Sequence, residues 1–192
     1  VSVQSDTGTK MEENMAERIA AYFREDSYLS VHPDHWGLAD TNDFLGRRVV
    51  WALKEGTSRK TLILTGHYDA VEIDCYGELK PLALKPEALR EEMLRQKLGD
   101  ELMQQELASG DWLPGRAAAD MKGGLAIGLY ELLTLPENAE IGVLFVAVCD
   151  EENVSAGMRG AVNVLLELKR RFALDYLATL VLEPQLPLAG KE

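Results

Sequence analysis

The stretch IGVLFVAV, residues 141–148, is the strongest indicator of the fold. Its residues are apolar without alternation, which is typical of a strand buried on both faces between layers of helices. Residues 176–182, YLATLVL, share this pattern and predict a second buried strand. Residues 47–54 and 60–65, RRVVWALK and KTLILT, are β-branched and apolar on either side of a turn, and they predict two adjacent strands.

Helical patterns lie between and around these strands. Residues 121–133 and 161–171 predict helices, and the glycines of the first indicate that another segment approaches its backbone closely. Residues 86–109 predict one helix on the outside of the domain, stopped at Gly110. An earlier helix follows a capping box made by Thr9 and Glu12 (residues 9–12). The alternation predicts the α/β class, as a three-layer αβα sandwich around a largely parallel central sheet.

The composition is that of one globular domain. Of the 192 residues, 46% are hydrophobic and 27% are charged. The net charge of −12 disfavours nucleic acid and anionic membranes as partners. The sequence begins without a secretion signal, has no apolar run long enough to cross a membrane, and carries two cysteines, Cys75 and Cys149, without a CxxC pair. These features predict a cytoplasmic protein.

Acidic residues and one histidine follow the predicted strands, and a further acidic residue, Asp120, stands at the N-terminal end of the predicted helix over 121–133. Ligands of open α/β sheets bind outside the carboxyl ends of the strands, so these side chains are expected on one rim. Singly, each is ordinary, because a His-X-Asp triplet is usually a satisfied pair and an acidic run is usually a charged loop. Together they need cations to neutralise them, which predicts a metal site. The residues are His67, Asp69, Asp120, Asp150, Glu151, Glu152 and Glu183.

The same residues stand in the motifs GHYD (66–69), GRAAADMKGG (115–124), DEE (150–152) and EP (183–184). In this order the motifs resemble the signatures of the dizinc peptidases and deacylases, the family that includes aminoacylase, acetylornithine deacetylase, succinyl-diaminopimelate desuccinylase and glutamate carboxypeptidase. The resemblance extends from about residue 5 to residue 184. It implies the catalytic-domain fold of those zinc enzymes.

The resemblance also implies a set of metal ligands. His67 would bind one metal and Glu183 would complete the shell of that metal. Asp120 would bridge to a second metal, held by Glu152. Nitrogen and oxygen ligands in this mixture suit zinc, at two ions per complete subunit, with cobalt or manganese as substitutes.

Two further residues have catalytic roles in this interpretation. Asp69, on the same side of an extended chain as His67, would accept the other imidazole N–H and fix the tautomer. Glu151 would stay free of metal, because side chains of neighbouring residues diverge in an extended segment. As general base it would take a proton from a water bridging the metals and return it to the leaving amine. The resemblance further implies a cis peptide bond between Asp120 and Met121.

The chain departs from the family pattern in several places. Ala117 stands where the family usually has the last glycine of GRG. Residues 75–111 are longer than the corresponding segment of most members. Within them, residues 76–82, YGELKPL, resemble the branch that contains the arginine-utilisation protein RocB.

The family's second metal takes a histidine from near the C-terminus, after an inserted lid and dimerisation domain. The other histidines here, His32 and His35, precede the signature strands and are interpreted as part of a polar loop anchored by Trp36. We therefore expect residues 1–192 to be the N-terminal part of the catalytic domain, without the lid and the C-terminal part, and to be inactive alone. The complete protein is expected to dimerise through the lid.

The leading functional interpretation is a metal-dependent hydrolase that cleaves an amide bond of a peptide or N-acyl amino acid with a free carboxylate. By resemblance, glutamate at position 183 favours deacylases and carboxypeptidases over aminopeptidases. The alternative is a metal-binding, non-catalytic module that acts through a partner. A purely structural α/β domain would require the motifs to occur together by accident. Substrate identity is not determined by this sequence, because side-chain recognition in the family comes largely from the lid and the partner subunit.

Overall fold

A five-stranded sheet lies at the centre of the computed structural model, which describes residues 1–184. The strands run in the order β1-β2-β4-β3-β5. β3 is parallel to both β4 and β5, whereas β2 is antiparallel to β1 and β4. The sheet is therefore largely parallel, with β2 as the reversed strand. The strands are β1 (Trp36–Asp40), β2 (Arg48–Lys54), β3 (Lys60–His67), β4 (Gly142–Val148) and β5 (Asp175–Val181).

β4 is the fully buried strand that its apolar sequence predicts. The prediction that residues 47–54 and 60–65 form neighbouring strands is wrong, because β4 lies between β2 and β3. The connection between those two strands bonds to the segment before β4, with Thr57 N–H donating to the carbonyl of Ala139 at 2.8 Å. A strand that is apolar on both faces buries most surface when strands flank both of its edges, which explains its central place.

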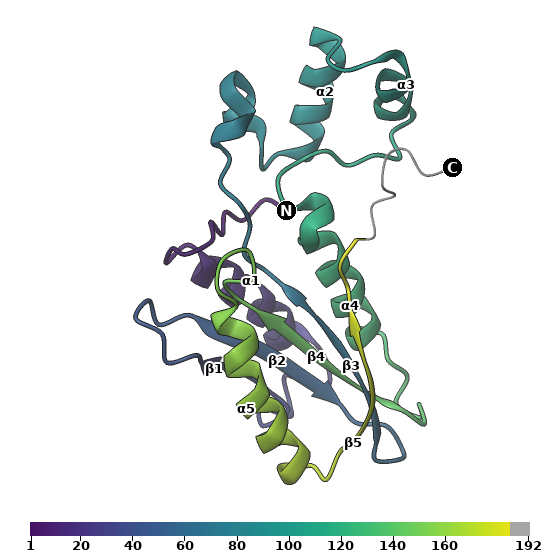
Figure 1. Ribbon diagram of the computed structural model, residues 1–192. Helices are drawn as coiled ribbons and strands as arrows, with labels where there is room; N and C mark the ends of the chain where they lie inside the picture. The colour runs from purple at the N-terminus through teal and green to yellow at the C-terminus, as the bar shows by residue number, and fades with distance from the viewer. Residues whose placement is uncertain (185–192) are drawn as a thin grey trace, which may run out of the picture.

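Helices cover both faces of the sheet, which confirms the predicted three-layer sandwich (Figure 1). α1 (Glu12–Glu25) and α4 (Gly124–Leu133) pack on one face, where Phe23 and Leu125 belong to the same apolar cluster as Phe145 of β4. α5 (Ala156–Arg171) packs on the other face. Among the described residues, none of the helices has the length and hydrophobicity needed to span a bilayer.

The two edge strands differ from the sequence prediction. β5 was expected to be buried, yet most of its side chains are exposed in the described structure, including Leu177 at 48%. It lies at the edge of the sheet, where the described helices leave it largely uncovered. At the other edge, the segment expected to be a loop around Trp36 forms β1, and the Trp36 indole donates to the carbonyl of Leu29.

The predicted helix over 86–109 is two helices, α2 (Pro86–Gln96) and α3 (Glu101–Ser109). Gly99 has a φ of 81°, and Asp100 caps α3 by accepting the N–H of Met103 at 2.8 Å. This left-handed turn and cap outweigh the apolar periodicity that continues across them. Together with η1 (Asp74–Leu82), the helices form a lobe beyond the end of β3 (Figure 1).

The close approach predicted for the glycine-rich helix is made by the segment after β5. A side chain at Gly124 would overlap the carbonyl oxygen of Leu182, and one at Gly128 would overlap the Leu182 side chain. Leu182 N–H also donates to the carbonyl of Thr65 at 2.9 Å. The glycines thus allow the residue before Glu183 to lie against both α4 and β3.

Gly124→Ala is expected to lower the free energy of unfolding by about 1–3 kcal/mol, the usual cost of overpacking. The added methyl group must displace the Leu182 backbone, although alanine gains about 1 kcal/mol in helix propensity over glycine. Chemical denaturation of the complete protein measures the change. Ile127→Ala is the control, because this α4 side chain is 62% exposed. A variant more stable than the parent would contradict the close packing.

Candidate metal centre

The sequence-predicted site residues come together at the carboxyl ends of the parallel strands. His67 is the last residue of β3, and residues 150–152 follow β4. Glu183 follows β5, which pairs with the other side of β3. Asp120 lies in η2 (Ala118–Gly123), the irregular turn before α4. Because these three strands are neighbours with the same direction, their ends bring residues distant in sequence to one rim.

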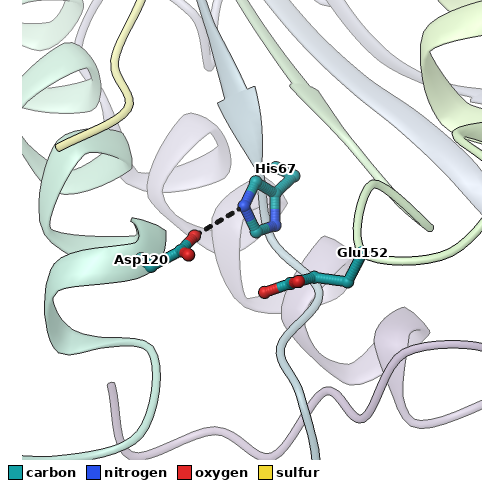
Figure 2. Close-up of side chains that lie close together, drawn as sticks. All are labelled: His67, Asp120 and Glu152. Atoms are coloured by element: carbon teal, nitrogen blue, oxygen red, sulfur yellow. Dashed lines mark hydrogen bonds and ion pairs between the residues drawn. The ribbon is translucent and has the colours of Figure 1, made fainter. Parts of the chain in front are cut away.

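His67 is at the centre of the cluster. Its Nε2 lies 2.9 Å from Asp120 Oδ1 and 3.3 Å from a carboxylate oxygen of Glu183. One potential ligand atom from each of His67, Asp120 and Glu152 lies within 4.8 Å of the other two (Figure 2). The described structure therefore brings together the residues for which metal binding was predicted.

The other ring nitrogen of His67 faces Asp69. Nδ1 lies 3.1 Å from the main-chain carbonyl oxygen of Asp69 and 3.3 Å from its carboxylate Oδ1. The imidazole is almost fully buried, which disfavours its charged form, but Asp69, Glu183 and Asp120 outweigh burial and raise the pKa of His67 to about 9. The surrounding carboxylates thus favour positive charge at this position, which would also favour a bound metal cation.

The carboxylates of the cluster repel one another. Burial raises the pKa of Glu152, and the nearby charge of Asp120 raises it further. The pKa of Glu183 is raised by burial as well as by the surrounding carboxylates, despite His67. Asp120, at 57% side-chain exposure, keeps one side of the cluster open to solvent. One imidazole nitrogen and several crowded carboxylate oxygens fit a zinc site, since a bound cation would relieve this repulsion.

Glu151 and Glu152 lie in a turn rather than in the extended segment that was expected. Asp150 before them has a φ of 63°, so the argument that their side chains diverge along an extended chain does not hold. Glu151 also faces the rim, with Oε2 3.8 Å from His67 Nε2 and a side chain 49% exposed. By geometry alone, therefore, either Glu151 or Glu152 could bind a metal ion at the cluster.

The Asp69 carboxylate, which lies 3.3 Å from His67 Nδ1, has further partners that were not predicted. It accepts the backbone N–H groups of Glu151 at 3.0 Å and Glu152 at 3.2 Å, and the hydroxyl of Thr7 at 2.9 Å. Burial opposes its ionisation, but the bonds from His67 and Glu151 hold the pKa of Asp69 below its usual value. Asp69 thus connects the imidazole to the turn that carries Glu151 and Glu152.

The remaining sequence predictions can be compared directly with the structure. The Asp120–Met121 peptide bond is cis, as the family resemblance implied. His35 lies apart from the cluster, with Nδ1 2.9 Å from Asp34 and Nε2 2.9 Å from Glu55. His32 likewise faces away, its Nδ1 2.8 Å from the carbonyl of Tyr28.

Sequence reasoning missed a buried ionic group behind the cluster. Arg47 contacts both Glu12 and Asp150, which lie 35 and 103 residues away from it in the sequence. The capping box predicted for Thr9 and Glu12 is wrong, because α1 begins at Glu12 after Met11, which has no side-chain cap hydrogen bond, and Glu12 instead accepts the N–H of Gly8 at 2.8 Å. No short motif joins these positions, so only the assembled fold reveals them.

Residues 96–192 match the model of peptidase family M20/M25/M40. The chain is 35% identical over 186 residues to Protein RocB of Bacillus subtilis (strain 168), covering 94% of this chain and 33% of that protein. It is 37% identical over 187 residues to the uncharacterized protein YqjN of the same strain, and the match covers 96% of this chain and 34% of YqjN. The chain therefore spans about a third of the length of these curated relatives.

Two solved structures share the fold. The M20 family metallo-carboxypeptidase Sso-CP2 from Sulfolobus solfataricus matches with a TM-score of 0.60 and 17% identity, covering 99% of this chain and 37% of that one. Human carnosine dipeptidase 1 matches with a TM-score of 0.53 and 18% identity, and the match covers 94% of this chain and 36% of the dipeptidase chain. At these identities the likeness concerns the fold.

Proposed function

Because the chain belongs to peptidase family M20/M25/M40, we propose that the cluster around His67 is the metal centre of an amide hydrolase. The observation that carries the proposal is the convergence of His67, Asp120 and Glu152 at the ends of parallel strands. The 35% identity to Protein RocB supports placing the chain in that branch of the family. Since the chain spans about a third of its relatives, we propose that it is one part of a larger catalytic unit.

In this proposal His67, Asp120, Glu152 and Glu183 would hold the zinc, with Asp120 serving both ions if two are bound. The closeness of His67 Nε2 to Asp120 and Glu183 supports this assignment. Zinc bound there would supply a Lewis acid that polarises the substrate carbonyl and makes water more acidic.

The protein's own residues would supply the positioning and the proton transfer. Asp69 holds the His67 ring through Nδ1, which leaves Nε2 directed at the cluster. Glu151 takes a proton from the water that attacks the amide carbon. As the carbon–nitrogen bond breaks, the same carboxyl group gives that proton to the leaving amine. This cycle returns Glu151 to its ionised form.

The substrate class in this proposal is a peptide or N-acyl amino acid with a free carboxylate. Glutamate at position 183 supports the deacylase or carboxypeptidase type. A cavity of about 310 Å³ is lined by Glu152 together with Asp6, Thr7, Thr9, Val71 and Glu72.

The test is to measure zinc content and hydrolysis together in the complete protein. We expect bound zinc and turnover of some members of a panel of dipeptides and N-acyl amino acids, but not of their C-terminally amidated forms. A chelator should abolish turnover, and zinc, cobalt or manganese should restore it. Zinc binding without hydrolysis of any substrate would support the non-catalytic alternative, and absence of zinc binding would contradict the metal centre.

A further inference from the structure

Two buried carboxylates, those of Glu12 and Asp69, accept hydrogen bonds from the backbone of the turn that carries Glu151 and Glu152. Glu12 Oε2 accepts the backbone N–H of Asp150 at 2.8 Å. Asp69 accepts the next two N–H groups along the chain, those of Glu151 and Glu152. Both carboxylate side chains are fully buried. Successive backbone N–H groups are thus bound by residues that come from α1 and from the end of β3.

Arg47 completes this arrangement. Its Nη1 donates to Glu12 Oε1 at 2.8 Å and to Asp150 Oδ1 at 2.6 Å, and its Nε donates to Asp43 at 2.5 Å. The arginine is 3% exposed, so the cation that neutralises Glu12 and Asp150 is itself inside the protein. A planar guanidinium can serve several carboxylates at fixed angles, which a lysine ammonium cannot do.

Asp150 links this group to the helix that follows the turn. Its Oδ2 accepts the N–H of Ala156 at the start of α5 at 3.0 Å, and its carbonyl accepts the N–H of Ser155 at 2.7 Å. The backbone of Asp150 adopts the left-handed conformation, with φ at 63°. This conformation is uncommon for residues other than glycine and persists where surrounding contacts hold it.

We infer that Glu12, supported by Arg47, is a positioning residue for Glu151 and Glu152. The inference rests on the proposed function, because it gives these two residues their roles as base and ligand. A buried ion pair is weak evidence for stability alone. Here the hydrogen bonds run to the backbone of the very turn that presents both side chains to His67. Loss of the Glu12 bond would free the N-terminal end of that turn while the Asp69 bonds remain.

Glu12→Gln in the complete protein tests the inference. Glutamine keeps the shape, but its single amide oxygen cannot accept both from Asp150 N–H on one side and from Arg47 and Gly8 N–H on the other, so at least one contact is lost. We expect faster amide hydrogen exchange across residues 150–152, with the largest change at Asp150, whose N–H loses its acceptor, and a smaller one at 151 and 152, whose bonds to Asp69 remain. We also expect a lower zinc affinity, by less than the about 10- to 100-fold typical of groups that bond a ligand side chain directly, because Glu12 acts only through the backbone of the turn. The kcat should fall by about 10²-fold with little change in KM, since misplacing a catalytic group by about 1 Å costs that much.

Glu13→Gln is the matched control. Glu13 is the next residue of α1, and it pairs with Arg48, the next residue after Arg47, at 2.6 Å. This pair joins α1 to the first residue of β2, whereas Arg47 lies just before that strand, and the side chains of Glu13 and Arg48 are partly exposed. Both variants therefore weaken the contact between α1 and the start of β2. Only Glu12→Gln is expected to change exchange at 150–152, zinc affinity and kcat.

The outcomes separate a positioning role from a structural one. If Glu12→Gln lowers the unfolding midpoint but leaves exchange at 150–152, zinc affinity and kcat unchanged, the inference is wrong. If that variant does not fold, Arg47→Lys provides the same test: loosening of the turn in a folded protein supports the inference, and normal protection contradicts it. A parent protein that hydrolyses nothing would defeat the proposed function, whereas hydrogen exchange would still decide whether Glu12 holds the turn.

Discussion

Replacing Glu151 with glutamine is expected to lower kcat of the complete protein by roughly 10²- to 10⁴-fold, the contribution typical of general acid–base catalysis. Glutamine has the size of glutamate, but its amide cannot take a proton from the attacking water. Glu151 Oε2 lies 3.8 Å from His67 Nε2, so the carboxylate is at the rim without being its closest member. Zinc stoichiometry, measured beside steady-state amide hydrolysis, is expected to stay at the parent value.

Glu152→Gln is the control for this experiment, because it makes the same chemical change one residue further along the turn. Glu152 is a proposed ligand, so its replacement is expected to reduce zinc content as well as turnover. A near-normal kcat in Glu151→Gln would show that Glu151 is not the base. Loss of zinc from that variant would instead assign Glu151 as a ligand.

Replacing Asp120 with alanine is expected to lower zinc affinity by more than about 100-fold, beyond the 10- to 100-fold loss typical of outer-shell partners. Asp120 Oδ1 lies 2.9 Å from His67 Nε2, and a ligand atom of Glu152 lies within 4.8 Å of both residues. A carboxylate between two proposed metals contributes to both, so its removal should affect both. Competition with a chromogenic chelator measures the affinity.

Asp111→Ala is the control for the loss of one aspartate, because Asp111 is exposed and lies outside the cluster. Its zinc affinity is expected to equal that of the parent protein. Circular dichroism establishes that each variant keeps its secondary structure. An unchanged zinc affinity in Asp120→Ala would exclude Asp120 as a ligand.

The parts of the fold that the sequence predicted are those with short-range signals. Residues 141–148 are apolar on both faces, and this pattern has few structural solutions other than a central strand. Because parallel strands end at one edge of a sheet, the residues after 60–65, 141–148 and 176–182 could be expected to meet before any coordinates were known. The structure does bring His67 and Asp120 together.

The parts that the sequence did not predict depend on contacts between distant segments or on competition between local signals. The apolar spacing across 86–109 continues through Gly99 and Asp100, where turn and cap chemistry prevail. The burial of Arg47 depends on Asp150, whose position is set only when β4 and α1 have packed. Most side chains of β5 are exposed because little covers this edge of the sheet. The sequence of β5 alone does not reveal which segments cover it.

The central position of β4 makes assembly of the sheet depend on a strand that is synthesised late. When residues 36–67 leave the ribosome, β2 and β3 are joined by a short turn, and a local hairpin between them is expected to form faster than distant pairing. A β2–β3 hairpin of this kind would have to open to admit β4, which lies between the two strands in the folded sheet. Until then its apolar edges can pair with other nascent chains. At about 5–20 residues per second, synthesis of residues 68–141 takes roughly 4–15 s. During this interval the unpaired edges of β2 and β3 can pair with other chains.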